Sequence, residues 1–288
     1  MKSRWNDETA ARYVEAALAA GQSEALGLRI YTSRIIGGDP DLVLHGGGNT
    51  SVKVTSVTGE ALMHIKGSGW DLDTIEAPGL PAVRLEPLLE TRNGPKLSDP
   101  DMVTLLRASL IDADAPNPSV EALLHAFLPF AFVDHTHATA ILALADQPDM
   151  RETVRRIYGD RLAYVPYVMP GFDLSIVADR IYREHPGCEG IWLENHGLFT
   201  FADDARSSYE LMIEFVTMAE QELARKGVEL TGPQPSDGPE DMALRARLET
   251  ALTRNGSPFA KGVFLDFRST AAIRAHAGKA DVEEIGLR

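Results

Sequence analysis

The stretch VDHTHATA, residues 133–140, places two histidines one residue apart in an apolar run. Together with the preceding residues it predicts a β-strand over 131–137, and alternate residues of a strand project from the same face. His135 and His137 can therefore reach one point, while Thr136 faces the other way. Two neutral imidazoles on one side of a strand suit a pair of metal ligands.

His196 is the third candidate ligand. The segment GIWLENHGLFTF (190–201) predicts two strands folded about Asn195-His196-Gly197, where an imidazole can reach outward from the end of a sheet. Three neutral imidazoles leave an open position on a divalent ion, which is typical of catalytic rather than structural zinc. A His-x-His pair by itself also occurs without a metal, and in other folds it serves metal-dependent hydrolysis.

Glu121 is the candidate acidic group. The segment PSVEALLHAFLPF (118–130) predicts a helix that starts at Ser119, so Glu121 would lie near a helix N-terminus that stabilises its carboxylate. There it could serve as a metal ligand or as a base beside the metal, or simply as an acid of the capping region. His125, four residues later on the same face, could orient Glu121 or only pack in the core.

Two glycine-rich loops are candidate anion sites. In GGGNTS (46–51) the glycines let the backbone approach a ligand closely, and Asn49 and Ser51 offer donors. KGSG (66–69) is a second such loop, and Ser119 at a helix start adds further donors. None of them has the spacing of a dinucleotide or nucleoside triphosphate motif. Together with a three-histidine site, they favour an enzyme that acts on a sugar phosphate.

The rest of the chain alternates helical and strand-like segments without an internal repeat, and 232–241 is the candidate domain boundary because it is rich in Gly and Pro. This divides the chain into a domain over 1–231 and a linker with a C-terminal extension over 232–288. Helices are predicted over 7–20, 98–112, 205–227 and about 240–254; strands are predicted in 41–54, as two strands around the glycine turn, in 61–72 and over 262–267.

Composition narrows the function classes. The 288 residues carry a formal charge of −14, which argues against non-specific binding to nucleic acid and against docking on an anionic membrane. Cys188 is the single cysteine, so no intrachain disulfide can form and a reducing compartment is expected. The N-terminal residues 1–18 carry charges where a signal peptide needs an apolar segment, and no run of about 18 apolar residues occurs. A cytoplasmic protein is expected.

The ordered series GNTS, KGSG, PSVEALLH, HTH, VPYVMPG and ENHG resembles the class II aldolase/adducin family, typified by fuculose- and rhamnulose-phosphate aldolases, over roughly residues 25 to 225. GGGNTSVK, KGSGWDL and PSVEALLHAFLP look most like the aldolase part of large bacterial proteins that join it to a short-chain dehydrogenase. Such a fusion would fit the abrupt C-terminal end of the sequence but leaves open whether the chain is part of a longer polypeptide, and no dehydrogenase fingerprint is present.

The resemblance implies an α/β fold, a three-layer α/β/α domain with a central and mainly antiparallel sheet, usually assembled as a cyclic tetramer. It makes Glu121 an acidic ligand or base, and it makes Tyr167 the proton donor that a neighbouring subunit supplies. Val120 stands where many members have a second serine, which removes a hydroxyl donor. The implied zinc ligands are His135, His137 and His196; the implied phosphate-binding residues are Gly48, Asn49, Ser51, Ser68, Gly69 and Ser119.

The implied function is that of a lyase. A metal-dependent aldolase, with zinc or another divalent ion, would reversibly cleave a ketose 1-phosphate such as rhamnulose or fuculose phosphate. The products would be dihydroxyacetone phosphate and an aldehyde. Related members epimerise, dehydrate or decarboxylate sugar phosphates, and the adducin head domain is a non-catalytic interaction module. That last alternative predicts loss of the three histidines, and all three are present.

Overall fold

The computed structural model describes residues 1–228, 242–254, 256–263, 265 and 273–274. The chain divides into two compact units, Met1–Glu229 and Leu230–Arg288. The second unit contains helix α10 (Met242–Leu252), where a helix is predicted. The predicted boundary segment 232–241 lies outside the described residues. So does most of the predicted strand 262–267, of which residues 262, 263 and 265 are described and are not in a strand.

The described part of the first unit is built on a seven-stranded sheet with the order β3-β2-β1-β4-β7-β6-β5. Neighbouring strands run antiparallel except β5 and β6, which run parallel, so the predicted mainly antiparallel sheet is confirmed. The strands are β1 (Asn49–Thr55), β2 (Ala61–Ile65), β3 (Ala82–Arg84), β4 (Phe132–Thr136), β5 (Leu162–Val165), β6 (Gly190–Leu193) and β7 (Gly197–Ala202).

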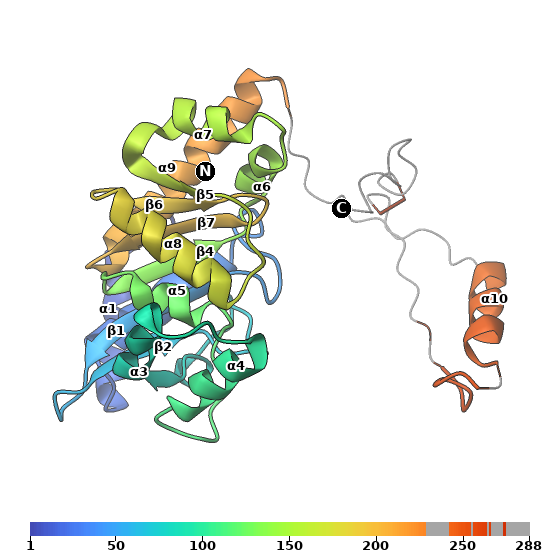
Figure 1. The fold of residues 1–288 in the computed structure, drawn as a ribbon, viewed down its shortest axis with the longest axis horizontal. Helices are drawn as coiled ribbons and strands as arrows, with labels where there is room; N and C mark the ends of the chain where they lie inside the picture. Colours follow the sequence, from blue (N-terminus) through green and yellow to red (C-terminus); the bar gives the residue numbers. More distant parts are fainter. Residues whose placement is uncertain (229–241, 255, 264, 266–272, 275–288) are drawn as a thin grey trace. The chain divides into compact units, whose positions relative to one another are not determined.

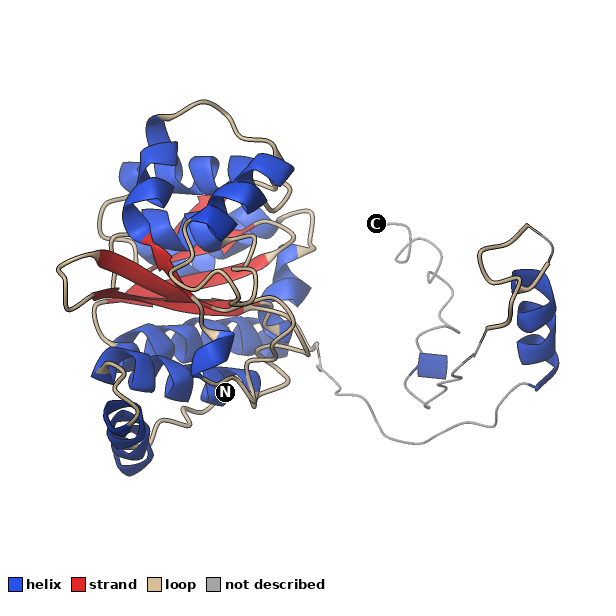
Figure 2. Cartoon of the chain, turned by 90° about the horizontal axis from the view of Figure 1, so that it is seen from below, coloured by secondary structure: helices blue, strands red, loops and turns tan. Residues whose placement is uncertain are grey.

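Helices cover both faces of this sheet and complete the predicted three layers (Figures 1 and 2). One face carries α2, α6, α7 and α9, with α1 packed on α2; the other carries α3, α4, α5 and α8. The helices are α1 (Asp7–Ala19), α2 (Glu24–Gly37), α3 (Leu85–Glu90), α4 (Asp99–Ala108), α5 (Ala122–Phe127), α6 (Thr139–Ala145), α7 (Met150–Tyr158), α8 (Phe172–Glu184) and α9 (Ala205–Arg225). None of the helices in the described ranges is long and apolar enough to cross a membrane.

The alternation of strand β4 directs its side chains to two different layers. Val133 packs with the buried residues of α5 and α8, and His135 points to the same side, where its ring stacks on Phe199. Asp134 and Thr136 point to the opposite layer, where the Asp134 carboxylate accepts a hydrogen bond from Ser208 of α9 at 2.5 Å. The Thr136 hydroxyl donates to the sulfur of Met212, also on α9, at 3.1 Å. The two faces of one strand therefore serve different purposes.

A buried ion pair fixes β4 against its neighbours. Arg29 of α2 and Asp134 are both fully buried, and the guanidinium Nη2 lies 2.5 Å from the carboxylate. The same guanidinium donates to the backbone carbonyl oxygens of Ser51 on β1 and Val133 on β4, at 3.2 and 3.4 Å. Desolvation lowers the pKa of Arg29, and the charge of Asp134 opposes that shift. One side chain thus connects a helix and two strands.

The region before β1 differs from the prediction. Residues 41–44 form no strand, because the N–H groups of Leu42 and Val43 both donate to the carbonyl of Asp39 in a turn. Both side chains are buried in the main core. Leu42 and Val43 are therefore apolar because they hold a turn against the core, and not because they belong to a strand. Strand β1 begins at Asn49, where pairing with His135 becomes possible.

The helix predicted over 118–130 is also shorter than expected. Pro118 forms a β-bridge with Gly67, and the Ser119 N–H donates to the carbonyl of Lys66 at 3.0 Å. These contacts hold residues 118–119 in an extended conformation, and α5 begins only at Ala122. By contrast, α4 and α9 begin close to the starts predicted for them, and each has an N-cap, Ser98 and Asp204, whose side chain accepts from a backbone N–H group.

The buried pair gives a stability prediction. Asp134→Ala leaves the Arg29 charge without a partner in the interior, and we expect it to lower the free energy of unfolding by about 3–5 kcal/mol. Asp173→Ala is the matched control, because its ion pair with Lys96 is exposed and should contribute less than about 1 kcal/mol. Urea unfolding followed by tryptophan fluorescence measures both, and equal midpoints for the two variants would contradict this account.

Candidate metal and anion site

Three histidines converge at one end of the sheet. His135 lies on β4, His137 directly follows it, and His196 lies in the turn between β6 and β7. The Nε2 atoms of His135 and His137 are 3.0 Å apart, and one ligand nitrogen from each of the three rings lies within 4.8 Å of the others. The structure therefore brings together all three predicted ligands.

The neighbouring residues orient these rings. The Nδ1 of His135 donates to the carbonyl of Leu198 at 3.1 Å, which leaves the lone pair of that ring on Nε2. Asn195 has a φ of 52°, and this left-handed residue turns the chain so that His196 faces the other two rings. A Cβ atom on Gly197 would lie 3.1 Å from both His135 and His137 and 2.4 Å from a backbone oxygen, so only glycine fits there.

Burial keeps the three imidazoles neutral. Desolvation is the main cause that lowers the pKa of each ring, well below the ordinary value for His135 and to about 4 for His196. The other imidazoles add to the shift at His135 and His196. Neutral rings with free lone pairs are the form that binds a metal ion.

Glu121 completes the cluster. Its Oε2 lies 3.4 Å from the Nε2 of His135, and its Oε1 lies 3.4 Å from the Nε2 of His196. Its Oε1 and the Nδ1 of His196 are buried and find no hydrogen-bond partner among the described residues. Burial raises the pKa of Glu121 to about 7, against the opposing effect of a hydrogen bond from Asn49. Three imidazoles and an unsatisfied carboxylate oxygen form a donor set that fits a divalent cation.

The local position of Glu121 differs from the prediction. It immediately precedes α5 instead of lying inside a helix that starts at Ser119, and its side chain makes no capping hydrogen bond. Asn49 holds it instead, because the amide Nδ2 donates to Oε2 at 2.7 Å. The backbone N–H of His125 donates to the carbonyl of Glu121 at 3.2 Å, but the His125 ring hydrogen-bonds to Asn49 and Ser51 and not to the Glu121 carboxylate.

A buried relay behind the site fixes the Asn49 amide. The Asn49 NH2 group faces Glu121 and Ser119, so its Oδ1 must accept from the Nε2 of His125 at 2.5 Å. With Nε2 protonated, the Nδ1 of this neutral ring accepts from the Ser51 hydroxyl at 2.8 Å. The two bonds leave Asn49 one amide orientation, the one that holds Glu121.

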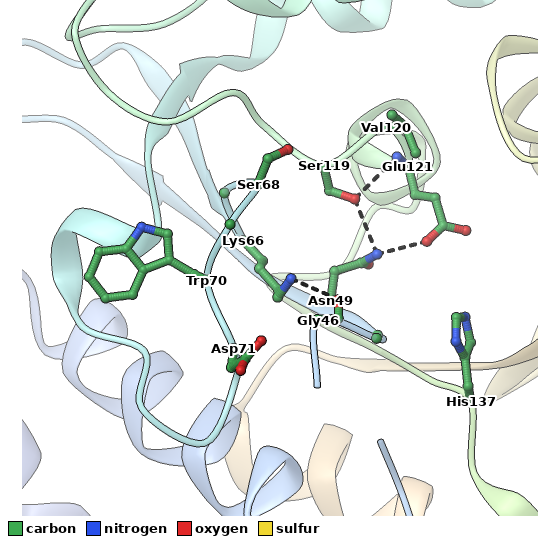
Figure 3. A pocket seen from close by; sticks show the side chains of 14 residues that line it. Gly46, Asn49, Lys66, Ser68, Trp70, Asp71, Ser119, Val120, Glu121 and His137 are labelled. Carbon is green, nitrogen blue, oxygen red and sulfur yellow. Dashed lines mark hydrogen bonds between the residues drawn. The ribbon is translucent and has the colours of Figure 1, made fainter. Parts of the chain in front are cut away.

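A pocket of about 430 Å³ opens beside the cluster (Figure 3). Its lining contains most of the residues predicted to bind substrate, and it also contains Lys66, Trp70 and Asp71, which the motif analysis did not select. The predicted residues in the lining are Gly48, Asn49, Ser68, Gly69, Ser119, Glu121 and His137. The sequence could have pointed to Lys66, because it is the first residue of the KGSG motif and stands between an apolar strand and a glycine turn.

Two predicted residues lie elsewhere. Ser51 is fully buried behind Asn49, where its hydroxyl is engaged by His125, and it does not line the pocket. Tyr167 lies on the loop after β5 with half of its surface exposed, and it does not line the pocket of its own chain. Its backbone N–H donates to the Glu194 carboxylate at 2.8 Å.

Comparison with known proteins gives a family and several relatives. The model of the Class II Aldolase and Adducin N-terminal domain matches residues 29–223. The chain is 36% identical over 225 residues to YuxG of Bacillus subtilis (strain 168), which is described as an uncharacterized oxidoreductase. That match covers 77% of this chain and 31% of YuxG, so the chain spans less than a third of the relative's length.

Solved structures share the fold. The N-terminal class II aldolase domain of a conserved protein from Thermoplasma acidophilum is 36% identical, with a TM-score of 0.68, and the match covers 77% of this chain and 99% of that domain. A sugar-phosphate aldolase from Thermotoga maritima is 13% identical, with a TM-score of 0.52, and the match covers 71% of this chain and 97% of that one. At this identity the second similarity is one of fold alone.

The relay yields a second prediction. His125→Phe keeps a ring in the core but leaves the Asn49 carbonyl and the Ser51 hydroxyl without partners, and we expect a loss of stability of about 1–3 kcal/mol. Ser207→Ala, at an exposed serine in the first turn of α9, should stay within about 0.5 kcal/mol of the parent protein. Thermal unfolding compares the two, and a stable His125→Phe variant would show that the relay does not constrain Asn49.

Proposed function

Because the chain belongs to the Class II Aldolase and Adducin N-terminal domain family, we propose that it is a metal-dependent lyase that reversibly cleaves a ketose 1-phosphate, such as rhamnulose or fuculose phosphate, to dihydroxyacetone phosphate and an aldehyde. One observation carries the proposal: three neutral imidazoles and a carboxylate form a cluster, and two of its members, His137 and Glu121, line a pocket that also holds hydroxyl groups and a lysine.

The metal site of this proposal consists of His135, His137 and His196, with Glu121 as a further ligand or as the acid and base beside it. The neutral rings and the unsatisfied Glu121 oxygen support binding of zinc or another divalent ion. When bound, such an ion polarises the substrate carbonyl and stabilises the negative charge that develops on its oxygen.

Glu121 would carry the proton at carbon. In the cleavage direction the hydroxyl of the departing aldehyde loses its proton, and the electrons of the carbon–carbon bond pass to the carbon next to the carbonyl. Glu121 in its protonated form then delivers a proton to that carbon. A pKa raised to about 7 by burial supports this role, because the carboxyl group can both hold and release a proton near neutral pH.

The phosphate would lie in the part of the pocket formed by Gly48, Asn49, Ser68, Gly69 and Ser119. Holding the phosphate there fixes the distance of the reacting carbons from Glu121. Ser51 supports this subsite indirectly, through His125 and Asn49.

Tyr167 would move the proton of the aldehyde hydroxyl from a neighbouring subunit. Its half-exposed side chain lies outside the pocket of its own chain, which supports action across an interface in a homo-oligomer, a tetramer in this proposal.

In this proposal residues 1–231 form the catalytic domain and 232–288 a linker and C-terminal extension. The acidic composition and the single cysteine, which is buried, support a cytoplasmic location.

Metal content is the first test. The purified protein should contain about one zinc or similar ion per chain by mass spectrometry, and His137→Ala should lose it because a three-histidine site cannot hold the ion with two rings. His185→Ala is the matched control, since His185 lies at the exposed end of α8. A parent protein that binds no divalent ion, even after addition of zinc, would favour an interaction module.

The role of Glu121 gives a separate prediction. Glu121→Gln should retain most of the metal on three histidines but reduce turnover of ketose 1-phosphates by at least about 100-fold, since general acid–base catalysis contributes roughly that much. Coupled detection of dihydroxyacetone phosphate measures the rate. A parental rate in this variant removes Glu121 from the mechanism.

Isomerised or dehydrated sugar phosphates, formed without cleavage by the parent protein, would favour an epimerase or a dehydratase.

A further inference from the structure

Glu194 stands between two segments that the proposed function uses. The metal turn is residues 193–196, which include His196, and the Tyr167 loop is residues 166–171. Glu194 directly follows β6, and its side chain is half-buried. A carboxylate in this place can hold the two segments together.

Glu194 holds the chain on both sides of Pro166. Its carboxylate Oε2 accepts the backbone N–H of Tyr167 at 2.8 Å. Its own backbone N–H donates to the carbonyl of Val165, the last residue of β5, at 3.0 Å. The proline between these two bonds has a restricted φ and no N–H of its own. The two bonds therefore set the direction in which the chain leaves β5.

The backbone of Tyr167 depends on this one carboxylate. Within the described part of the chain, no other hydrogen bond of a backbone group is found for residues 166–169. Val168, the next residue, packs on the buried cluster between the sheet and α8. The side chain of Val168 anchors the loop after Tyr167, and Glu194 places Tyr167 itself.

The Glu194 carboxylate is itself oriented. The hydroxyl of Tyr164, on β5, bonds to the same side chain, and the guanidinium of Arg151, on α7, lies over the Tyr164 ring at 5.3 Å from its centroid. A carboxylate can accept several hydrogen bonds, and bonds to an ionised acceptor are stronger than those between neutral groups. The link to Tyr167 is therefore a charge-assisted bond to a fixed acceptor.

The metal turn ties Glu194 to His196. The N–H of His196 donates to the carbonyl of Leu193 at 3.3 Å, and Asn195 has a φ of 52°, so four consecutive residues form a tight turn. Few combinations of φ and ψ close such a turn. The backbones of Glu194 and His196 therefore cannot shift independently of each other.

We propose that Glu194 is a positioning residue that couples the metal turn to the Tyr167 loop, so that binding of a divalent ion at His196 orders the backbone of Tyr167. This inference rests on the proposed function and deepens it. With Tyr167 acting in the site of a neighbouring subunit, the metal state of one subunit controls the tyrosine that the next subunit receives. Glu194 then connects the active sites of the oligomer.

Such a coupling acts in both directions. If the ion orders the Tyr167 loop, then a loop that is held by Glu194 strengthens binding of the ion by the same factor, roughly 5- to 150-fold for couplings of this kind. A residue that only stabilises the fold would not link these two quantities.

Hydrogen–deuterium exchange of the full chain, with and without zinc, tests the inference. In the parent protein zinc should slow amide exchange in the Tyr167 loop by about 10-fold or more. Glu194→Ala should remove this protection and weaken zinc binding by a similar factor in a chelator competition, because the Tyr167 N–H has lost its acceptor. Glu194→Gln should recover part of both, since an amide oxygen still accepts from that N–H.

Glu189→Ala is the matched control. Glu189 precedes β6 as Glu194 follows it; its N–H donates at 2.8 Å to the carbonyl of Arg161, next to β5, and its carboxylate pairs with the Arg161 guanidinium. It lies at the end of β6 away from the histidines, so the zinc-dependent protection of the Tyr167 loop should match the parent protein. Equal losses in the two alanine variants would show a general loosening of the sheet and overturn the inference.

Kinetics give a further readout. In zinc-saturated protein, Glu194→Ala should lower kcat for a ketose 1-phosphate with little change in KM, because Tyr167 moves a proton and does not hold the phosphate. Zinc binding that leaves exchange in the Tyr167 loop unchanged overturns only this inference. Coupling through Glu194 in a protein that does not cleave ketose 1-phosphates overturns only the proposed reaction, and a parent protein that binds no zinc overturns both.

Discussion

The ion pair between Arg29 and Asp134 is the constraint on which the site depends. It joins α2 to β4, and the same guanidinium holds the backbone of β1 through Ser51. Asp134 lies between Val133 and His135 in β4, and its side chain points to the opposite face of the strand from theirs. Because both charges are fully buried, any shift of β4 along α2 would leave one of them unpaired in the interior, at a cost of several kcal/mol. The strand that carries the first histidine is thereby fixed in register from its far face.

The near face of the same strand holds the first histidine of the three-histidine cluster beside Glu121. Neutral imidazoles and a carboxylate oxygen direct lone pairs to one point, and the hydrogen bonds around them do not satisfy the Oε1 of Glu121. Such an arrangement persists only if the surrounding structure imposes it. Leu198 orients His135, Gly197 leaves room for the rings, and Asn49 holds Glu121. The unsatisfied Glu121 oxygen and the convergent ring nitrogens form a donor set that fits a divalent cation.

The pocket is divided by Asn49 into two chemically different ends. His137 and Glu121 stand at one end, where acid–base and metal chemistry would take place, and Lys66 and Ser68 stand at the other (Figure 3). A small ligand with a carbonyl at one terminus and an anion at the other would span both. The net charge of −14 works against anionic ligands over the rest of the surface, whereas Lys66 places a positive charge in the lining of this pocket.

The sequence by itself determined the local patterns and the residue types of the site. The alternation in VDHTHATA predicted that His135 and His137 share a face, and the turn ENHG predicted that His196 reaches outward, because strand periodicity and turn residues act over a few neighbours. The packing of the layers set where the side chains of Glu121, Ser51 and Lys66 lie. The bridge between Pro118 and Gly67 shortened the helix at Glu121, and the buried ring of His125 took the hydroxyl of Ser51 away from the pocket. These are contacts between segments about 50 to 75 positions apart, and no local pattern encodes them, since burial and hydrogen-bond partners depend on how the layers pack.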